Sequence, residues 1–265
     1  MRHARLTRAS GLRVEPVVLK LGGSVITYKD EPLKANEEAI NRLSEEIVQA
    51  KIQQLVIVHG GGSFGHPLAQ KYKIMEGYNG KASQLLGFSE THKAMVDLNH
   101  IVLEALIRHN IPAFTVTPSS IIVTKSGRMV ARIDEHLKSL LHLGLVPLLY
   151  GDAVLDSDRG FTILSGDQLV ASAAIQISAE RIVIGVEGDG LWADPKKRRG
   201  EPIRTCTLQE LIELQKQARK TSAHDVTGGM QGKLAELVPA VEKGITVTMV
   251  DASEPQRVYK ALRGE

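Results

Sequence analysis

Two glycine-rich loops, each directly after a short apolar strand, constrain the fold more than any other feature of this chain. Residues 17–24 read Val-Val-Leu-Lys-Leu-Gly-Gly-Ser, and residues 55–66 read Leu-Val-Ile-Val-His-Gly-Gly-Gly-Ser-Phe-Gly-His. Because glycine has no Cβ, several backbone N–H groups can approach one ligand closely. Concave arrays of such donors bind anions, most often phosphates. The sequence therefore predicts a phosphate-binding loop at the end of each of these two strands.

A third glycine-rich element lies near the C-terminus. Residues 225–233 read Asp-Val-Thr-Gly-Gly-Met-Gln-Gly-Lys and stand at the start of a helical pattern. The N-terminus of a helix attracts anions through its free N–H groups and its dipole. Lys20 in the first loop, His66 beyond the second and Lys233 in the third add side chains that can neutralise phosphate oxygens. Three such elements suggest a site for two phosphorylated or acidic molecules at once, as a kinase requires.

The composition argues against several other classes of protein. The formal net charge is only +3, and the basic residues form no stripe interleaved with aromatic ones, so we expect no nucleic-acid partner. No apolar run reaches the roughly 18 residues that cross a bilayer, so we expect no membrane partner. The single cysteine, Cys206, rules out an internal disulfide and fits a reducing cytosol. We therefore expect a cytoplasmic protein.

Apolar strands alternate with amphipathic helices along the chain. Strands are predicted at 17–21, 54–58, 113–116, 121–124, 145–150, 181–186 and 246–250, with a hairpin of 152–155 and 161–164. Helices are predicted at 35–49, 83–109, 134–142, 168–177, 208–219, 232–242 and 255–262. Strands joined through helices favour a mainly parallel sheet covered on both faces, which is a three-layer α/β/α sandwich. Residues 1–14 carry five basic side chains and no acid; we expect a disordered basic extension there, with an organelle transit segment as the alternative.

Two standard nucleotide loops are excluded. The Gly-x-Gly-x-x-Gly pattern at 60–65 formally matches the dinucleotide fingerprint. That site also needs an acidic residue closing the next strand about 20 residues on, and residues 67–87 contain no clear strand. The phosphate loop G-x-x-x-x-G-K-[ST] is absent. A nucleotide site in this chain must therefore be built in another way.

The motifs resemble those of a known superfamily. Lys-x-Gly-Gly-Ser at 20–24, Gly-Gly-Gly at 60–62, Ser-Gly-Asp at 165–167 and the element at 225–233 resemble the amino acid kinase superfamily. Within it, residues 59–66, Tyr-Gly-Asp at 150–152 and residues 225–230 are similar to the archaeal-type isopentenyl phosphate kinases. His66 is the discriminating residue, because amino-acid and carbamate kinases lack it. The resemblance implies the amino acid kinase fold as a single domain over 15–265, with an acceptor-binding lobe at about 15–165 and an ATP-binding lobe at about 166–265.

The resemblance also implies contacts to ATP. Lys20 would lie between the ATP phosphates and the acceptor, and Lys233 would hold ATP from the opposite side. The implied nucleotide-binding residues are Lys20, Gly22, Gly23, Ser24, Gly62, Glu187, Gly229 and Lys233. At 186–190 the chain reads Val-Glu-Gly-Asp-Gly where the family has Thr-Asp-Val-Asp-Gly, so contacts from Glu187 to the adenine or ribose are expected to differ. No residues are assigned to a metal, and Mg²⁺ is expected to be carried by ATP.

On the acceptor side, His66 would bind the phosphate already present on the substrate. The implied acceptor-binding residues are Gly61, Gly62, His66 and Gly166, and the implied catalytic residues are Lys20, Lys29, His66 and Asp167. Four of these have structural alternatives: Lys20 as a surface lysine after a strand, His66 as a structural histidine, Lys29 as a solvated loop lysine, and Asp167 as the cap of the following helix, a role compatible with pairing to the lysines. Residues 71–99 are predicted to line a pocket for a hydrocarbon tail, with Phe88, Met95 and Leu98 as candidates for its end wall.

The expected function is the ATP-dependent phosphorylation of isopentenyl phosphate to isopentenyl diphosphate, a step of isoprenoid biosynthesis. Catalysis would rest on positioning and charge neutralisation, without a covalent nucleophile. One alternative is a kinase of another small phosphate or phosphonate, such as fosfomycin. Another is a nucleotide-binding sensor without turnover, against which Lys20 and Lys233 argue. By analogy with the family, the long helix after the second glycine loop is expected to form a homodimer.

Overall fold

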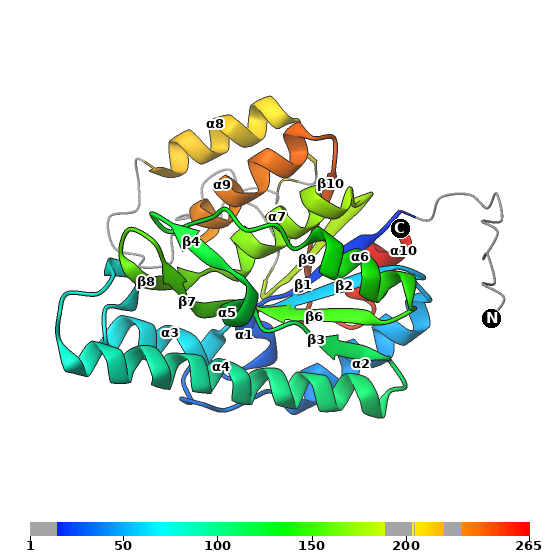
Figure 1. Cartoon of the computed structure of the whole chain (residues 1–265). Helices are drawn as coiled ribbons and strands as arrows, with labels where there is room; N and C mark the ends of the chain where they lie inside the picture. Colours follow the sequence, from blue (N-terminus) through cyan, green and yellow to red (C-terminus); the bar gives the residue numbers. More distant parts are fainter. Residues whose placement is uncertain (1–14, 189–202, 204, 220–228) are drawn as a thin grey trace, which may run out of the picture.

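A six-stranded parallel sheet forms the centre of the molecule. The computed structural model describes residues 15–188, 203, 205–219 and 229–265 (Figure 1). The strands of the sheet are β1 (Val17–Leu21), β2 (Leu55–His59), β3 (Ala113–Thr115), β6 (Val146–Tyr150), β9 (Arg181–Val186) and β10 (Thr246–Asp251). Their order is β10-β9-β1-β2-β6-β3, and every neighbouring pair is parallel. The predicted mainly parallel sheet is confirmed.

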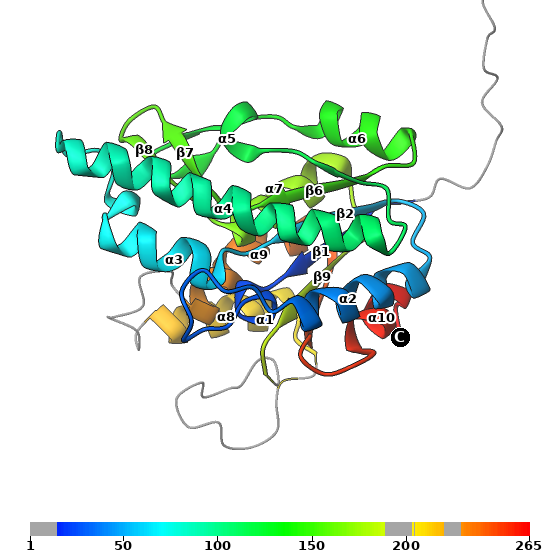
Figure 2. The ribbon, with the colours of Figure 1, turned by 90° about the horizontal axis from the view of Figure 1, so that it is seen from below.

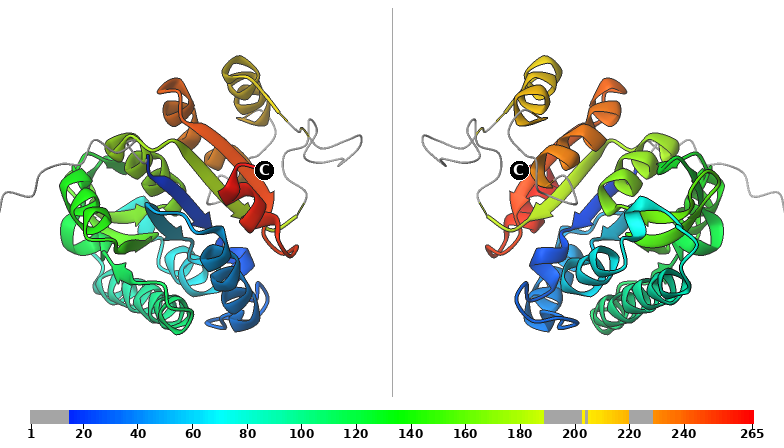
Figure 3. Two further views of the ribbon diagram at one scale, coloured as in Figure 1. Left: turned by 90° about the vertical axis from the view of Figure 1, so that its right-hand side faces the viewer. Right: turned by 90° about the vertical axis from the view of Figure 1, so that its left-hand side faces the viewer.

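The central strands are apolar at nearly every position because both faces of the sheet are covered. Successive side chains of a strand point to opposite faces. In β1, Leu19 accordingly packs in one hydrophobic cluster while its neighbour Val18 packs in the other. In β2, Ile57 and Val58 divide between the same two clusters. This alternation between two buried faces produces the three-layer α/β/α architecture (Figures 1 and 3).

Each face of the sheet is covered by its own set of helices. One cluster includes side chains of α2 (Glu37–Ala50), α3 (Gly62–Lys71), α4 (Ala82–Arg108) and α10 (Arg257–Arg263). The other includes side chains of α6 (Asp134–His142), α7 (Gly166–Ile177) and α9 (Gly229–Glu242). A further helix, α8 (Leu208–Arg219), packs on α9. No helix within the described ranges has both the length and the apolar character needed to cross a bilayer.

A second, smaller sheet adjoins α4. It contains β4 (Val123–Lys125), β5 (Arg128–Met129), β7 (Asp152–Asp156) and β8 (Gly160–Leu164) in the order β5-β4-β7-β8. The antiparallel pair of β7 and β8 confirms the predicted hairpin. Asp156 closes its turn by accepting hydrogen bonds from the N–H groups of Asp158 and Arg159, both at 2.9 Å. The short 3-10 helix η1 (Ile74–Glu76) packs against β8.

The predicted elements differ from the structure in a few places. The prediction of a strand at 121–124 is wrong, because Ile121 ends the short helix α5 (Pro118–Ile121) and the strand β4 begins at Val123. Two helices directly after the glycine loops, α1 (Gly23–Ile26) and α3, were not predicted. Glycines and Pro67 hide the helical pattern of α3. Pro67 has no N–H to donate to Ser63 O, which instead accepts a hydrogen bond from Leu33 N–H at 3.3 Å. The expected extension at 1–14 lies outside the described residues, and the lobe boundary at 165/166 stays a prediction.

The C-terminal helix α10 is held by a buried carboxylate of α2. Glu46 is only 1% exposed and accepts hydrogen bonds from the N–H groups of Gln256 and Tyr259 at 3.1 and 3.0 Å. Arg42, one turn earlier on α2, pairs with Glu46 at 2.6 Å and also donates to the carbonyl oxygen of Ala252. The free N–H groups at the start of α10 are therefore capped from another helix, beside which α10 lies in Figure 2.

Candidate active site

The two glycine loops and two later turns meet at the carboxyl ends of the parallel strands. Backbone hydrogen bonds hold them there: Gly22 N–H donates to Gly185 O and Gly60 N–H to Leu21 O, both at 2.9 Å. In α/β sheets of this kind, ligands bind outside the carboxyl ends of the strands. The glycines predicted to bind phosphate therefore stand where the fold places a binding site.

The two glycine loops lie in direct contact with each other. A Cβ on Gly60 would stand 2.7 Å from the nitrogen of Gly23, and Gly62 has a positive φ of 46° that favours glycine. Thr27 joins the loops through its hydroxyl, which donates to Gly23 O at 2.8 Å and accepts from Ser63 N–H at 3.0 Å. The loops therefore form one continuous wall. Thr27 was not predicted, because a lone threonine after a helix carries no signal for such a link.

Behind the loops lies a cluster of two lysines and one aspartate. Lys20 of β1 is 3% exposed, and its Nζ lies 2.5 Å from Oδ1 of Asp167. Lys233 of α9 contacts the same carboxylate, with its Nζ 3.0 and 3.1 Å from the two oxygens. The chain thus brings together three predicted site residues that are far apart in sequence. Asp167 does not cap α7, because Ser165 does so by accepting from Gln168 N–H at 3.2 Å.

Burial controls the electrostatics of this cluster. It lowers the pKa of Lys20 to about 8, although the nearby Asp167 acts in the opposite direction. Burial also acts to raise the pKa of Asp167, but the two ammonium groups outweigh it and hold that pKa below its ordinary value. With both lysines protonated, the cluster carries one net positive charge in a site of low water content. Such fixed charge is what stabilises negative charge that develops during phosphoryl transfer.

The other predicted acceptor residues lie at the starts of α3 and α7. Gly166 begins α7, and a Cβ there would stand 3.5 Å from Cε of Lys20. Gly61 is the N-cap of α3. His66 is exposed on α3, about one turn after Gly62. A Cβ on Gly166 would also lie 3.3 Å from the carbonyl oxygen of His59, so the chain leading into α3 and the start of α7 lie side by side at the ends of the strands.

Two predicted site residues lie apart from this centre. Lys29 is exposed in the turn between α1 and α2, and Glu187 is exposed directly after β9. Within the described residues, neither contacts the cluster of Lys20, Asp167 and Lys233. Gly229 begins α9, as predicted for a glycine of the third element, whereas residues 225–228 and 189–190 of the motifs lie outside the described residues.

Comparison with known proteins agrees with this geometry. The amino acid kinase family profile matches residues 15–251. The chain belongs to the amino acid kinase family. It is 37% identical to the isopentenyl phosphate kinase of Methanothermobacter thermautotrophicus, over 94% of this chain and 96% of that protein. It is 28% identical to the isopentenyl phosphate kinase of Arabidopsis thaliana, over 94% of this chain and 90% of that protein.

Solved structures also resemble this chain. A structure of isopentenyl phosphate kinase superimposes with a TM-score of 0.80 at 35% identity, covering 94% of this chain and 96% of that one. The UMP kinase of Ureaplasma parvum superimposes with a TM-score of 0.62 at 18% identity, covering 96% and 97%, which shows a shared fold alone. The expected amino acid kinase fold is thus confirmed.

This amino acid kinase contains a histidine–aspartate pair that was not predicted. Asp152, fully buried at the start of β7, accepts from Nδ1 of His92 at 3.0 Å and from Ala153 N–H at 2.8 Å. The hydrogen bond to Asp152 raises the pKa of His92. Asp152 follows Gly151, where a Cβ would stand 3.0 Å from the nitrogen of Gly166, so the pair lies near the site. A histidine within a long amphipathic helix gives no sequence signal for this role.

Aromatic residues gather beyond α3, where the hydrocarbon pocket was predicted. Phe88 of α4 stacks on Phe161 of β8 with ring centroids 4.7 Å apart, and Tyr78 packs on Phe161 at 5.6 Å. Of the other two end-wall candidates, Leu98 is fully buried in the main core. The Sδ of Met95 would lie only 2.8 Å from a Cβ on Gly65, so Met95 packs against α3. Phe88 is thus the candidate that belongs to the aromatic cluster.

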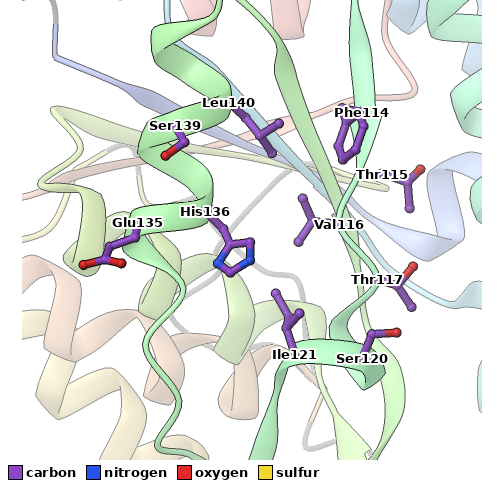
Figure 4. A pocket seen from close by; sticks show the side chains of 10 residues that line it. All are labelled: Phe114, Thr115, Val116, Thr117, Ser120, Ile121, Glu135, His136, Ser139 and Leu140. Carbon is purple, nitrogen blue, oxygen red and sulfur yellow. The ribbon is translucent and has the colours of Figure 1, made fainter.

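A cavity of about 570 Å³ lies elsewhere in this kinase, between the edge strand β3 and helices α5 and α6 (Figure 4). Its lining residues include Thr115, Thr117, Glu135 and His136. None of the predicted site residues lines it. This cavity is therefore separate from the centre formed by Lys20, Asp167 and Lys233.

Proposed function

We propose that this protein transfers the γ-phosphate of ATP to isopentenyl phosphate, which yields isopentenyl diphosphate and ADP for isoprenoid biosynthesis. The observation that carries the proposal is the bridging of Lys20 and Lys233 by Asp167, directly behind two touching glycine loops. Relatives named isopentenyl phosphate kinase, in archaea and in a plant, support the choice of acceptor.

In the proposed reaction, an oxygen of the acceptor phosphate forms a bond to the γ-phosphorus of ATP. The bond from that phosphorus to the β,γ-bridging oxygen breaks, and the electron pair leaves with ADP. A phosphate dianion needs no base, so the chain contributes positioning and charge rather than a nucleophile. Lys20 and Lys233 neutralise the charge that moves between the oxygens, and Asp167 keeps both ammonium groups in place.

The start of α3 and the start of α7 would bind the acceptor phosphate. A dianion entering an apolar cavity must replace its lost water with hydrogen-bond donors. We assign this role to the backbone N–H groups of Gly61 and Gly166 and to the imidazole of His66, with Lys29 as a further cation. The proposed nucleotide contacts are Gly22, Gly23, Ser24, Gly62, Glu187, Gly229 and Lys233.

The described residues offer no cage for a magnesium ion. They contain no group of three or more His, Cys, Asp or Glu side chains that could hold a metal, and ammonium groups occupy both oxygens of Asp167. We propose that Mg²⁺ enters as the counter-ion of ATP, with phosphate oxygens among its ligands.

A cytoplasmic homodimer is the proposed form of the enzyme. Exposed apolar side chains along α4, namely Leu85, Leu86, Val96 and Ile107, support an interface on this helix. The single cysteine supports a reducing compartment. Sedimentation at working concentration tests the dimer, and a monomer there would remove it.

An acceptor panel tests the function. Purified protein with ATP and Mg²⁺ would be given isopentenyl phosphate, fosfomycin, UMP, glutamate and carbamate, with ADP release and the ³¹P signal of a diphosphate as readouts. We expect the highest kcat/KM with isopentenyl phosphate, and much slower product formation with Lys20→Ala. A preference for fosfomycin would support the alternative small-phosphonate kinase, and ATP binding without any turnover would support a sensor.

A further inference from the structure

His59, the last residue of β2, is fully buried beside the second glycine loop. Its ring stacks on that of Tyr150, with centroids 5.4 Å apart and planes inclined by 19°. Both ring nitrogens have partners: Nδ1 lies 3.0 Å from the carbonyl oxygen of Gly60, and Nε2 lies 3.2 Å from Nδ2 of Asn99. The Oδ1 of Asn99 in turn accepts from the hydroxyl of Thr115 at 2.8 Å.

The chemistry of these partners permits one arrangement of protons. A carbonyl oxygen only accepts, so Nδ1 of His59 must carry the hydrogen. Burial lowers the pKa of His59 to about 4, so the ring is neutral near pH 7 and Nε2 must accept. Asn99 therefore presents its amino group to the ring and its oxygen to Thr115. A relay of hydrogen bonds thus runs from Thr115 through Asn99 and His59 to the carbonyl of Gly60.

The carbonyl at the end of this relay determines where the next N–H group points. The described part of the chain has no cis peptide bond, and in a trans peptide the C=O and N–H groups point in opposite directions. Because the carbonyl of Gly60 faces the ring of His59, the N–H of Gly61 faces away from it. Gly61 is buried, and its N–H donates to no acceptor among the described residues. It is therefore a donor held ready for a ligand.

We propose that His59 is a positioning residue that aims the N–H of Gly61 at the acceptor phosphate, and that Asn99 and Thr115 hold its ring in the required tautomer. This inference rests on the proposed function for the identity of the acceptor. His59 itself touches no substrate. His59 keeps the N–H of Gly61 oriented before the substrate binds. The loop therefore loses less conformational entropy during binding.

The relay begins at the wall of the separate cavity. Thr115, which donates the first hydrogen bond, is among the side chains that line the cavity beside β3 (Figure 4). A change at this distant position can therefore be used to disturb the loop without touching the substrate pocket.

Two substitutions of His59 separate positioning from packing. His59→Phe keeps the stacked ring and loses the donor to Gly60. His59→Asn loses the ring, but its Nδ2 can occupy the place of the lost Nδ1 and still donate. We expect His59→Phe to lower kcat/KM for isopentenyl phosphate by on the order of 10-fold to 100-fold, with His59→Asn retaining more activity and KM for ATP little changed in both. If His59→Phe is the more active of the two, His59 serves packing only and the proposal fails.

A matched pair of threonine variants keeps the test valid if the His59 variants do not fold. Thr115→Val removes the hydroxyl that donates to Asn99, and Thr124→Val removes a hydroxyl that donates to Asp156 over the same 2.8 Å. We expect Thr115→Val to reduce kcat/KM for isopentenyl phosphate about threefold to tenfold, and the Thr124→Val control to stay within about twofold. Equal effects of the two variants would overturn the proposal.

¹⁵N NMR of the histidine rings tests the relay without any turnover. We expect His59 of the ligand-free protein to show a protonated Nδ1 and an unprotonated Nε2 from pH 5.5 to 8. A protonated Nε2 would reject the relay even if the protein is an active kinase. If the wild-type protein does not phosphorylate isopentenyl phosphate, the proposed function fails instead, and the tautomer still decides whether the loop is held in this way.

Discussion

A β-carbon on Gly23 would stand only 2.2 Å from the backbone nitrogen of Gly62. The two glycine loops are thus packed backbone to backbone, and no β-carbon fits between Gly23 and Gly62. This contact explains why both loops are glycine-rich at these positions. It also means that ATP and the acceptor are predicted to bind to two halves of one rigid surface.

Gly23→Ala should therefore push the loops apart. Because misplacement by about 1 Å can cost a hundredfold in rate, we expect kcat/KM for ATP to fall by roughly that factor. Circular dichroism should still show a folded protein, since the change lies at the end of the strands. Ser89→Ala, at an exposed position of α4, serves as the control. Gly23→Ala with wild-type kinetics would show that the loops tolerate separation.

Lys20→Ala should reduce turnover far more than it weakens ATP binding. Its charge matters most in the transition state, where negative charge shifts between oxygens, so we expect kcat to fall by on the order of a thousandfold. Lys34→Ala, which removes an exposed lysine paired with Glu31, is the control. If KM for ATP rises while kcat holds, Lys20 only binds the nucleotide.

The pKa of Lys20 predicts an alkaline limit to activity. In the free enzyme this pKa is lowered to about 8, so the ammonium form is lost as the pH rises through that value. We expect kcat/KM to decline above about pH 8, and kcat to decline only at higher pH because bound phosphates stabilise the ammonium form. If Lys20→Arg retains activity, the decline should disappear, since arginine stays protonated. A wild-type kcat/KM that is flat to pH 9.5 would contradict this assignment.

His66→Ala should lower phosphorylation of isopentenyl phosphate by on the order of tenfold to a hundredfold or more. A charge-assisted hydrogen bond to the acceptor phosphate is worth roughly 1.5–3 kcal/mol. His66→Gln should retain part of the activity, because it keeps a donor without the charge. Isothermal titration should show unchanged ATP affinity. Wild-type turnover by both variants would reject the acceptor role of His66.

Phe88→Ala should widen the range of acceptors. Its stacking partner Phe161 and the neighbouring Tyr78 form the aromatic cluster beyond α3, and an apolar pocket discriminates mainly by volume. We expect the ratio of kcat/KM for longer prenyl phosphates to that for isopentenyl phosphate to rise by about tenfold. Phe114→Ala, at an exposed phenylalanine of β3, is the matched control. An unchanged ratio would place the end of the pocket elsewhere.

Much of the fold follows from local patterns. The strands β1 and β2 are apolar at consecutive positions, which is typical of parallel strands buried on both sides, and long helices such as α2 and α4 carry clear amphipathic periods. Helix α3 was missed because Gly62, Gly65 and Pro67 stand in its first two turns, where good helix formers would mark a helix. Local propensity and the observed structure conflict at this position.

The site was predictable where a motif carried it. Lys20, Asp167 and Lys233 were assigned from short motifs, and the structure brings their side chains together. The residues that hold the motifs in place through hydrogen bonds were not predictable. Thr27, Asn99 and His92 act through hydrogen bonds to residues far away in sequence, and no local pattern marks a residue of this kind.

The carboxylate of Glu46 has a practical consequence for any work on this protein. It accepts hydrogen bonds from Arg42 and from two N–H groups at the start of α10. Helix α10 is therefore an integral part of the fold, attached through buried polar contacts. Deleting residues 253–265 would remove both N–H donors of the buried Glu46 and expose the apolar side chains that α10 covers. Affinity tags placed after residue 265 should therefore be joined through a flexible spacer, and shortening the chain at this end is not a neutral route to better crystals.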